Sequence, residues 1–211
     1  LAKTSGQSKV VNFNTKGSAV TSFTYGGGSG YTNGAYGADA AYLGMTDDGK
    51  VRFMLSGVTG TVNASEVQVV EYAAVSDHVS YYAVSGGKLI HYISQDLNKL
   101  PVSFINNGTA PSYLNEGVKY YSYDGHYFYT DYAVMLSDYQ NNTNGQNAVN
   151  AGNAFYNFFQ FKNMREATKY SGEELNVMLQ SAMSAAGVDT ASSKLSGTGL
   201  SFVKYQNVYS V

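Results

Sequence analysis

The chain contains no cysteine among its 211 residues, which excludes disulfide bonds, thiolate metal ligands and thiol catalysis. Charged residues make up only 13% of the sequence, about half of the usual share, and the net charge is -2 at pH 7. A chain with so little positive charge has no basic surface for a phosphate backbone, so no nucleic-acid partner is expected. Every apolar run is far shorter than the ~20 residues of a membrane-spanning helix, so no membrane insertion is expected.

Tyrosine and glycine, together with asparagine and serine, take the place of the charged residues. The sequence has 20 tyrosines and 23 glycines. Low charge combined with abundant tyrosine, asparagine and serine is typical of surfaces that meet carbohydrate or cell wall. The composition therefore favours a carbohydrate-related partner over a nucleic acid.

The densest group of tyrosines lies between residues 119 and 133 and is interrupted by Asp124 and Gly125. An Asp-Gly pair between two alternating runs predicts a β-hairpin, whose side chains point alternately to two faces. One face of this hairpin would carry Tyr121, Tyr123, Tyr127 and Tyr129. Such a row fits either core packing or contact with the apolar face of a sugar, because tyrosine rings serve both roles. These four tyrosines are the candidate carbohydrate-binding residues.

Residues 10–74 have the signals of a small closed β-barrel. The expected strands are short and separated by turn residues: 10–13, 20–25, 38–43, 51–55, 61–62 and 67–72. Residues 26–34 contain so many glycines that they are expected to form a loop. A tight turn at residues 63–65 would precede the last strand of the barrel.

Residues 75–140 are expected to form a second small β module that ends in a short helix. One hairpin is expected at residues 81–92, and the tyrosine hairpin at residues 120–129 is the second. The connection between the two hairpins contains Pro101 and Pro111 and is expected to be a loop.

The short helix is expected to begin with Thr130 as its N-cap. Its buried side would carry Tyr132, Met135, Leu136 and Tyr139. Residues 141–153 are rich in asparagine and have no apolar period, which indicates a linker. An aromatic group follows at residues 155–161 and must be buried against another surface.

The last part of the chain, residues 150–211, is expected to be helical. Ser171 and Glu174 have the spacing of a capping box, which predicts a helix that is stopped by Gly187. The buried stripe of this helix would carry Leu175, Met178, Leu179 and Met183. A final helix is expected after residues 196–199. The predicted fold class is therefore α+β, with a small β-barrel, a β-hairpin module and a few α-helices.

Three strings within residues 10–74 carry a resemblance to a known fold. They are Asp39-Ala-Ala-Tyr-Leu-Gly44, Ser56-Gly-Val-Thr-Gly60 and Val62-Asn-Ala-Ser-Glu-Val67. Together they resemble a bacterial SH3-like barrel. Barrels of this kind usually accompany cell-wall hydrolases as targeting or support modules.

Further strings in the second half extend the resemblance. They lie at residues 110–114, 117–125, 127–131, 155–161 and 193–199. Together they resemble the peptidoglycan endo-β-N-acetylglucosaminidases, or autolysins, of Gram-positive bacteria. The resemblance implies an SH3-like barrel at residues 10–74, an accessory hairpin module at 75–140 and the start of a lysozyme-like catalytic domain at 150–211. It also implies a protein secreted to the cell wall of a Gram-positive bacterium.

The chain departs from that family at the residues that carry the chemistry. The family's catalytic glutamate lies in a Glu-Ser-Gly-Trp-Gly-like string, whereas this sequence has no tryptophan. The chain also begins with Leu-Ala-Lys rather than Met, as expected of a piece of a longer protein. The resemblance therefore implies a non-catalytic support portion of a glycoside hydrolase. This portion would position peptidoglycan strands or another wall polymer, without a cofactor, for a C-terminal catalytic domain that it contacts.

Two other classes of function remain as alternatives. One is an independent active hydrolase, against which the missing glutamate string argues. The other is a stand-alone surface adhesin or wall-binding protein without hydrolase activity, in which the C-terminal helices would pack as a finished domain.

Other titratable side chains have structural explanations. Glu173 and Glu174 lie in the first turn of a helix, where capping and the helix dipole account for them. Asp124, His126 and Asp131 are close enough in sequence to hold a metal or act as acid and base. An Asp-Gly turn accounts for Asp124, however, and strand alternation places His126 on the face opposite the tyrosines. No residue is therefore assigned as catalytic or as a metal ligand.

Overall fold

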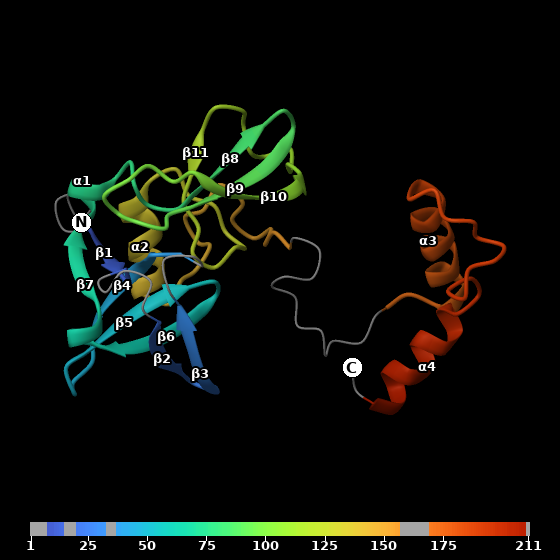
Figure 1. The fold of residues 1–211 in the computed structure, drawn as a ribbon, viewed down its shortest axis with the longest axis horizontal. Helices are drawn as coiled ribbons and strands as arrows, with labels where there is room; N and C mark the ends of the chain where they lie inside the picture. Colours follow the sequence, from blue (N-terminus) through green and yellow to red (C-terminus); the bar gives the residue numbers. More distant parts are fainter. Residues whose placement is uncertain (1–7, 15–19, 33–36, 157–168, 210–211) are drawn as a thin grey trace. The chain divides into compact units, whose positions relative to one another are not determined.

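The computed structural model describes four stretches of the chain, residues 8–14, 20–32, 37–156 and 169–209. The chain divides into two compact units, Leu1–Phe161 and Lys162–Val211. Helices and mostly antiparallel strands are both present, which confirms the mixed α and β character (Figure 1). In these four stretches, no helix has the length and apolar character needed to cross a bilayer.

The first unit contains a seven-stranded antiparallel sheet with the strand order β3-β2-β6-β5-β4-β1-β7. Its strands are β1 (Lys9–Asn12), β2 (Thr21–Tyr25), β3 (Gly28–Thr32), β4 (Asp39–Met45), β5 (Lys50–Leu55), β6 (Val58–Asn63) and β7 (Gln68–Glu71). A 3-10 turn at Ala64–Glu66 precedes β7, and the short helix α1 (Tyr72–Val75) follows it. All six strands predicted in this region are confirmed, with boundaries shifted by a few residues.

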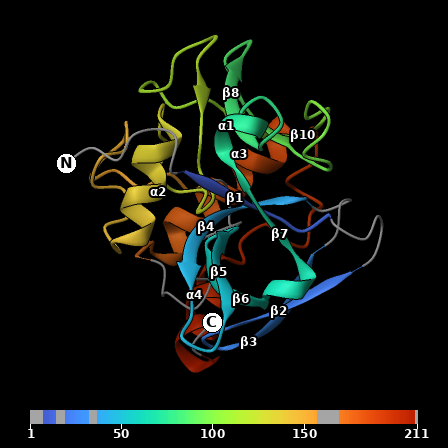
Figure 2. The same cartoon turned by 90° about the vertical axis from the view of Figure 1, so that its left-hand side faces the viewer.

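The predicted closed SH3-like barrel is not confirmed. Within the described residues, the ladder of paired strands ends at β3 on one side and at β7 on the other, and no pairing joins these two edges. Figure 2 shows that the sheet is strongly curved. The described part of the chain therefore forms a curled sheet with two edges.

The prediction of a loop at residues 26–34 is wrong for Gly28–Thr32, which forms β3. This strand pairs with β2 so that Phe23 lies opposite Gly30. A Cβ atom on Gly30 would lie 2.7 Å from the Phe23 ring. Glycine therefore makes room here for an aromatic ring from the neighbouring strand, a role that glycine content alone does not reveal.

The central strands of the seven-stranded sheet contribute buried residues to both faces, because successive strand residues point to opposite sides. One face packs into a core that contains Val11, Phe13, Ala40, Val51, Phe53, Val62 and Val67. The other face adds Val10, Ala41, Leu43 and Met54 to a second core that also contains several tyrosines. The sheet is therefore the layer between two cores.

A second, four-stranded antiparallel sheet completes the β structure of the first unit, with the order β10-β9-β8-β11. Its strands are β8 (Tyr81–Ser85), β9 (Lys88–Ile93), β10 (Ser103–Thr109) and β11 (Lys119–Tyr120). The predicted hairpin at residues 81–92 is confirmed as β8–β9. The prediction of a loop between Pro101 and Pro111 is wrong, because β10 pairs with β9 there. β10 is an edge strand with an irregular register and polar side chains, so it lacks the alternation that marks a half-buried strand.

The tyrosine-rich segment at residues 120–129 does not form the predicted regular hairpin. Only Tyr121 and Tyr129 form a bridge, with N···O distances of 2.7 and 3.0 Å. Between them, the Asp124 carboxylate accepts hydrogen bonds from the Ser122 hydroxyl and from two backbone N–H groups. These bonds close a compact loop in place of two paired strands. The Asp-Gly pair therefore predicts the turn correctly, but it does not predict whether the flanking residues pair as β-strands.

The helix predicted after this loop is confirmed as α2 (Tyr132–Gln140), but its N-cap is Asp131 rather than Thr130. The Asp131 carboxylate accepts hydrogen bonds from the N–H groups of Ala133 and Val134, as a capping residue does. The predicted buried side is correct and has one more member: Tyr132, Met135, Leu136, Asp138 and Tyr139.

The prediction of a linker at residues 141–153 is wrong, because this segment is anchored to the rest of the first unit. The buried Asn150 amide binds the backbone at residues 126 and 128, with distances of 2.8 and 2.9 Å. The Asp138 carboxylate accepts hydrogen bonds from the backbone and the side chain of Asn147. The asparagines of this segment therefore form hydrogen bonds that fix its path.

The aromatic group predicted as an anchor at residues 155–161 is described only for its first two members. Phe155 packs against Phe128, with ring centroids 5.5 Å apart. The Tyr156 ring lies 4.7 Å from that of His126. The other aromatic residues of this group lie outside the described residues.

The second unit contains two helices, α3 (Gly172–Ala185) and α4 (Gly199–Tyr209). The capping box is confirmed, since the Ser171 hydroxyl and the Glu174 carboxylate each accept a hydrogen bond from the other residue's N–H. The buried stripe is partly wrong, because of its four residues only Met183 is buried. The helices touch at Gly172 and Gly199, where an added Cβ on either glycine would overlap the other helix.

Packing around Gly60 yields a stability prediction. An added Cβ there would lie 2.6 Å from the Phe53 ring and 3.1 Å from the Thr24 carbonyl oxygen. Gly60→Ala is therefore expected to lower the free energy of unfolding by about 1–3 kcal/mol. Gly26→Ala is the control, because nothing lies within 4 Å of its added methyl group. Thermal unfolding followed by circular dichroism checks this, and equal Tm values for the two variants would contradict it.

Candidate functional site

A cleft of about 150 Å³ lies between the two sheets of the first unit, and we call it the inter-sheet cleft. It is lined by residues from β4, from the β5–β6 turn and from β8 to β10. Residues of the compact loop at positions 120–129, which we call the tyrosine-rich loop, complete the lining. Its main polar and aromatic lining residues are Asp39, Ser56, Ser80, Tyr82, His91 and Tyr123. Segments that are far apart in the sequence thus meet at one hollow.

Asp39 supplies the single carboxyl group among the described lining residues, and only 1% of the residue is exposed. It accepts hydrogen bonds from the N–H and the hydroxyl of Ser80, at 2.7 and 2.5 Å, and from the Tyr123 hydroxyl at 2.5 Å. Burial raises the pKa of Asp39, and these hydrogen bonds oppose the rise. Both carboxylate oxygens are engaged, so Asp39 connects the walls of the cleft.

A continuous seam of hydrogen bonds extends from Asp39 along the junction of the two sheets. The Ser80 hydroxyl oxygen accepts from the Ser94 N–H at 2.9 Å, and the Ser94 carbonyl accepts from the Ala38 N–H at 2.7 Å. The Asn14 side chain donates to the carbonyl of Gln95 at 2.7 Å. The seam joins β4 and the end of β1 to the second sheet, which fixes the base of the cleft.

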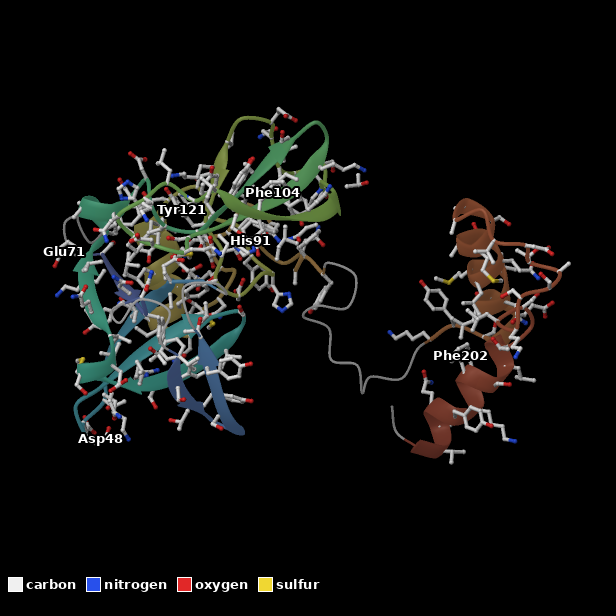
Figure 3. All side chains as sticks on the ribbon, viewed as in Figure 1. Asp48, Glu71, His91, Phe104, Tyr121 and Phe202 are labelled. Carbon is white, nitrogen blue, oxygen red and sulfur yellow. The ribbon has the colours of Figure 1, made fainter. Side chains whose placement is uncertain are left out.

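One wall of the cleft is a row of side chains on neighbouring strands of the second sheet. His91 on β9 lies opposite Tyr82 on β8 and Ile105 on β10. The rings of Tyr82 and His91 are stacked, with centroids 4.1 Å apart and planes within 4° (His91 is labelled in Figure 3). Burial lowers the pKa of His91 to about 4, because desolvation disfavours the imidazolium. This wall is therefore neutral near pH 7.

The β5–β6 turn contributes to the lining through Ser56. Ser56 and Gly57 both have positive φ angles, of 49° and 76°. Two such residues in succession form the turn whose twist matches that of a β-hairpin. The Gly57 N–H donates to the Tyr123 carbonyl at 2.9 Å, so the turn is fastened to the tyrosine-rich loop.

A second hollow, of about 300 Å³, adjoins the cleft at this turn. Leu55 and Ser56 line both hollows. The remaining lining residues of the second hollow are Phe23, Tyr31, Thr32 and Val58. The Thr32 hydroxyl donates to the carbonyl of Gly37, which lines the inter-sheet cleft, at 3.0 Å. The two hollows are therefore connected through two separate pairs of residues.

The lining of the cleft is mainly uncharged. Most glycoside hydrolases use two carboxyl groups about 5–10 Å apart, and the residues that the structure describes bring one carboxyl group, that of Asp39, to this lining. Across the part of the chain that the structure describes, no cluster of three or more His, Cys, Asp or Glu side chains could hold a metal. Hydroxyl groups, aromatic rings and apolar side chains remain, and these are the groups that bind an uncharged polar ligand.

Of the four tyrosines predicted to bind carbohydrate, Tyr123 alone lines the inter-sheet cleft. Tyr121, labelled in Figure 3, and Tyr129 are buried in the core next to α2, and Tyr127 packs against the same core with part of its surface exposed. Tyr121, Tyr123 and Tyr129 are buried, which supports the role of tyrosine in core packing. Carbohydrate binding by the four residues stays a prediction.

Four of the titratable side chains considered in the sequence, Asp124, His126, Asp131 and Glu174, have structural partners. Glu174 caps α3, and Asp131 caps α2. Asp124 closes the tyrosine-rich loop, and the Nδ1 atom of His126 forms a 2.8 Å hydrogen bond with the Phe155 carbonyl. These contacts account for each side chain without a catalytic role.

Sequence reasoning did not identify Asp39, Tyr82 or His91 as residues of a site. Their proximity depends on how the two sheets meet, and this arrangement has no local signature in the sequence. One signal was present, because Asp39 begins an otherwise apolar strand. A carboxyl group in such a position needs hydrogen-bond donors from elsewhere in the fold.

Comparison with known proteins gives two similar relatives, and no protein-family model matches the chain. Over 131 residues, the chain is 28% identical to a protein of Streptococcus pneumoniae serotype 4 named "Putative endo-beta-N-acetylglucosaminidase". A protein of the same name from the R6 strain of that species is also 28% identical over 131 residues. The matches cover 62% of this chain but only 15% and 14% of the relatives, so the chain spans a small part of their length. These similarities support a link to a glycosidase-associated family.

The hydrogen bond from Tyr123 to Asp39 yields a second prediction. Tyr123→Phe removes one of the donors to a buried carboxyl, so the free energy of unfolding is expected to fall by about 1–3 kcal/mol. Tyr25→Phe is the matched control, because Tyr25 is 40% exposed and should change stability by less than about 0.5 kcal/mol. Chemical denaturation at neutral pH measures both values. Equal stability of the Tyr123→Phe variant and the parent chain would show that this bond does not hold the cleft.

The low pKa of His91 yields a prediction about pH. Above pH 6.5 the imidazole is neutral in both the folded and the unfolded chain, so its titration does not affect stability. Below pH 6.5 the unfolded chain binds a proton that the folded chain resists until about pH 4. Stability should therefore fall over this window by an amount on the order of 3 kcal/mol from this residue.

Denaturation of the parent chain and of His91→Gln at several pH values isolates this contribution from that of the carboxyl groups. The difference in stability between the two proteins should shrink as the pH falls from 6.5 to about 4. A difference that stays constant over this range would mean that His91 does not titrate as its burial implies.

Proposed function

We propose that the first unit is a glycan-binding support portion of a cell-wall endo-β-N-acetylglucosaminidase, with the inter-sheet cleft as its binding site. The observation that carries this proposal is the cleft, whose walls combine hydroxyl groups with aromatic and apolar side chains. The names of the two pneumococcal relatives support a glycan as the class of ligand.

The cleft has the groups that a sugar requires. A pyranose ring presents an apolar face and a rim of hydroxyl groups, so it is bound by apolar or aromatic surfaces flanked by hydrogen-bonding groups. Tyr82 and Ile105 belong to the aromatic and apolar part of the lining, and the exposed Ser56 adds a hydroxyl group. The neutral state of His91 near pH 7 keeps charge away from this surface.

The proposed role is positioning rather than cleavage, because Asp39 is fully engaged and has no carboxyl partner in the cleft. In this proposal the protein is secreted and acts at the wall of a Gram-positive bacterium. Its helices α3 and α4 begin a lysozyme-like catalytic domain, and the first unit holds the peptidoglycan strand that this domain cleaves.

Sedimentation with purified peptidoglycan sacculi tests the proposed function. The chain is expected to sediment with the sacculi without releasing reducing ends. Glu173→Gln should behave like the parent chain, because Glu173 lies at the exposed start of α3. Release of reducing ends that is lost in this variant would assign catalysis to the chain itself and contradict the proposed role.

Two substitutions, one on β10 and one directly before it, test whether the glycan binds in the cleft. Ile105→Asn changes the wall of the cleft and is expected to weaken sedimentation about tenfold, which corresponds to about 1.4 kcal/mol. Val102→Asn is the matched control, since Val102 is 80% exposed and lies outside the lining. Both variants should melt like the parent chain, because surface substitutions change stability little. Equal binding by the two variants would place the glycan elsewhere.

A further inference from the structure

The inter-sheet cleft and the second hollow meet at the β5–β6 turn. Leu55 and Ser56 belong to both linings, and the hydrogen bond from Thr32 to Gly37 joins the two hollows at another point. Both hollows lie within the first unit. A ligand that leaves one hollow over Ser56 therefore enters the other.

The ridge between the hollows is fixed. The positive φ angles of Ser56 and Gly57 are held by the pairing of β5 with β6, which runs up to Leu55 and Val58. The Gly57 N–H is bonded to the carbonyl of Tyr123. The β5–β6 turn that separates the two hollows is thus held by backbone hydrogen bonds on both sides.

The two hollows have the same chemical character. The second hollow presents the rings of Phe23 and Tyr31 beside the Thr32 hydroxyl, and Tyr31 is 59% exposed. Among the described residues, no Lys or Arg lines either hollow, and the one carboxyl group, Asp39, is occupied by its donors. A ligand that fits one hollow should therefore resemble the ligand that fits the other: uncharged, with apolar faces and hydroxyl or amide groups.

The size of the hollows argues for a polymer. The second hollow, of about 300 Å³, is at the lower end of the range of pockets that enclose a small molecule, about 300–1,000 Å³. The inter-sheet cleft measures only about 150 Å³. A single small ligand would remain mostly exposed there and would bind weakly. Repeating units that occupy both hollows bind together, because the first unit bound raises the effective concentration of the next.

We propose that the two hollows are neighbouring subsites of one groove, in which an uncharged linear polysaccharide crosses the ridge at Ser56. This inference rests on the proposed function and adds the second hollow, with Tyr31 as the residue that contacts the additional sugar units. An anionic wall polymer is an unsuitable occupant, since its charges would find no cationic partner among the lining residues that the structure describes.

Oligosaccharides of N-acetylglucosamine of increasing length test this inference, with isothermal titration calorimetry on the whole chain. The hexasaccharide is expected to bind at least about tenfold more tightly than the disaccharide. Tyr31→Ala should remove most of this gain while leaving disaccharide binding nearly unchanged. Tyr25→Ala is the matched control, because Tyr25 lies on the same hairpin, is 40% exposed and lines neither hollow.

The possible outcomes separate this inference from the proposed function. Sacculus binding combined with equal affinity for short and long oligosaccharides, or with equal effects of Tyr31→Ala and Tyr25→Ala, would overturn the groove and leave the proposed function standing. Loss of sacculus binding after anionic polymers are stripped from the sacculi would also overturn the groove. No binding to sacculi of any kind would overturn both.

Discussion

A carboxyl group removed from water must find hydrogen-bond donors, and the first unit is built around this requirement at Asp39. Its donors belong to two other parts of the chain, Ser80 before β8 and Tyr123 in the tyrosine-rich loop. Moving either part away would remove some of the donors of this buried carboxyl group. Asp39 is therefore one of the groups that hold the two sheets together at the cleft, beside the backbone bond from Ala38 to Ser94.

The neutral lining of the groove determines what kind of recognition it can perform. The part of the lining that the structure describes has no cationic or free anionic side chain. Association with a groove lined in this way is not steered by charged groups of the site and should depend little on salt. Discrimination must then come from shape and from hydrogen bonds made at contact. The low charge of the whole sequence has the same consequence for the rest of its surface.

The sequence predicts features that are encoded by neighbouring residues. The capping box at Ser171 and the hairpin at residues 81–92 were predictable because turns, caps and alternation are local. The strand β3 was not, since its glycines serve rings that lie on β2. The site was predicted least, because His91 and Asp39 meet only through the packing of one sheet against another. Tyrosine density marked a segment of which Tyr123 lines the cleft, but most of its rings fill the core.

The anchored segment after α2 has a mechanical consequence. Val149 and Phe155 donate backbone hydrogen bonds to residues 128 and 126, and Asn150 binds between them. Traction applied to the chain beyond residue 156 would therefore load this short clamp before it reached α2 or the tyrosine core. Because residues 126 and 128 belong to the tyrosine-rich loop that lines the inter-sheet cleft, such a pull would act on one wall of the cleft through these hydrogen bonds.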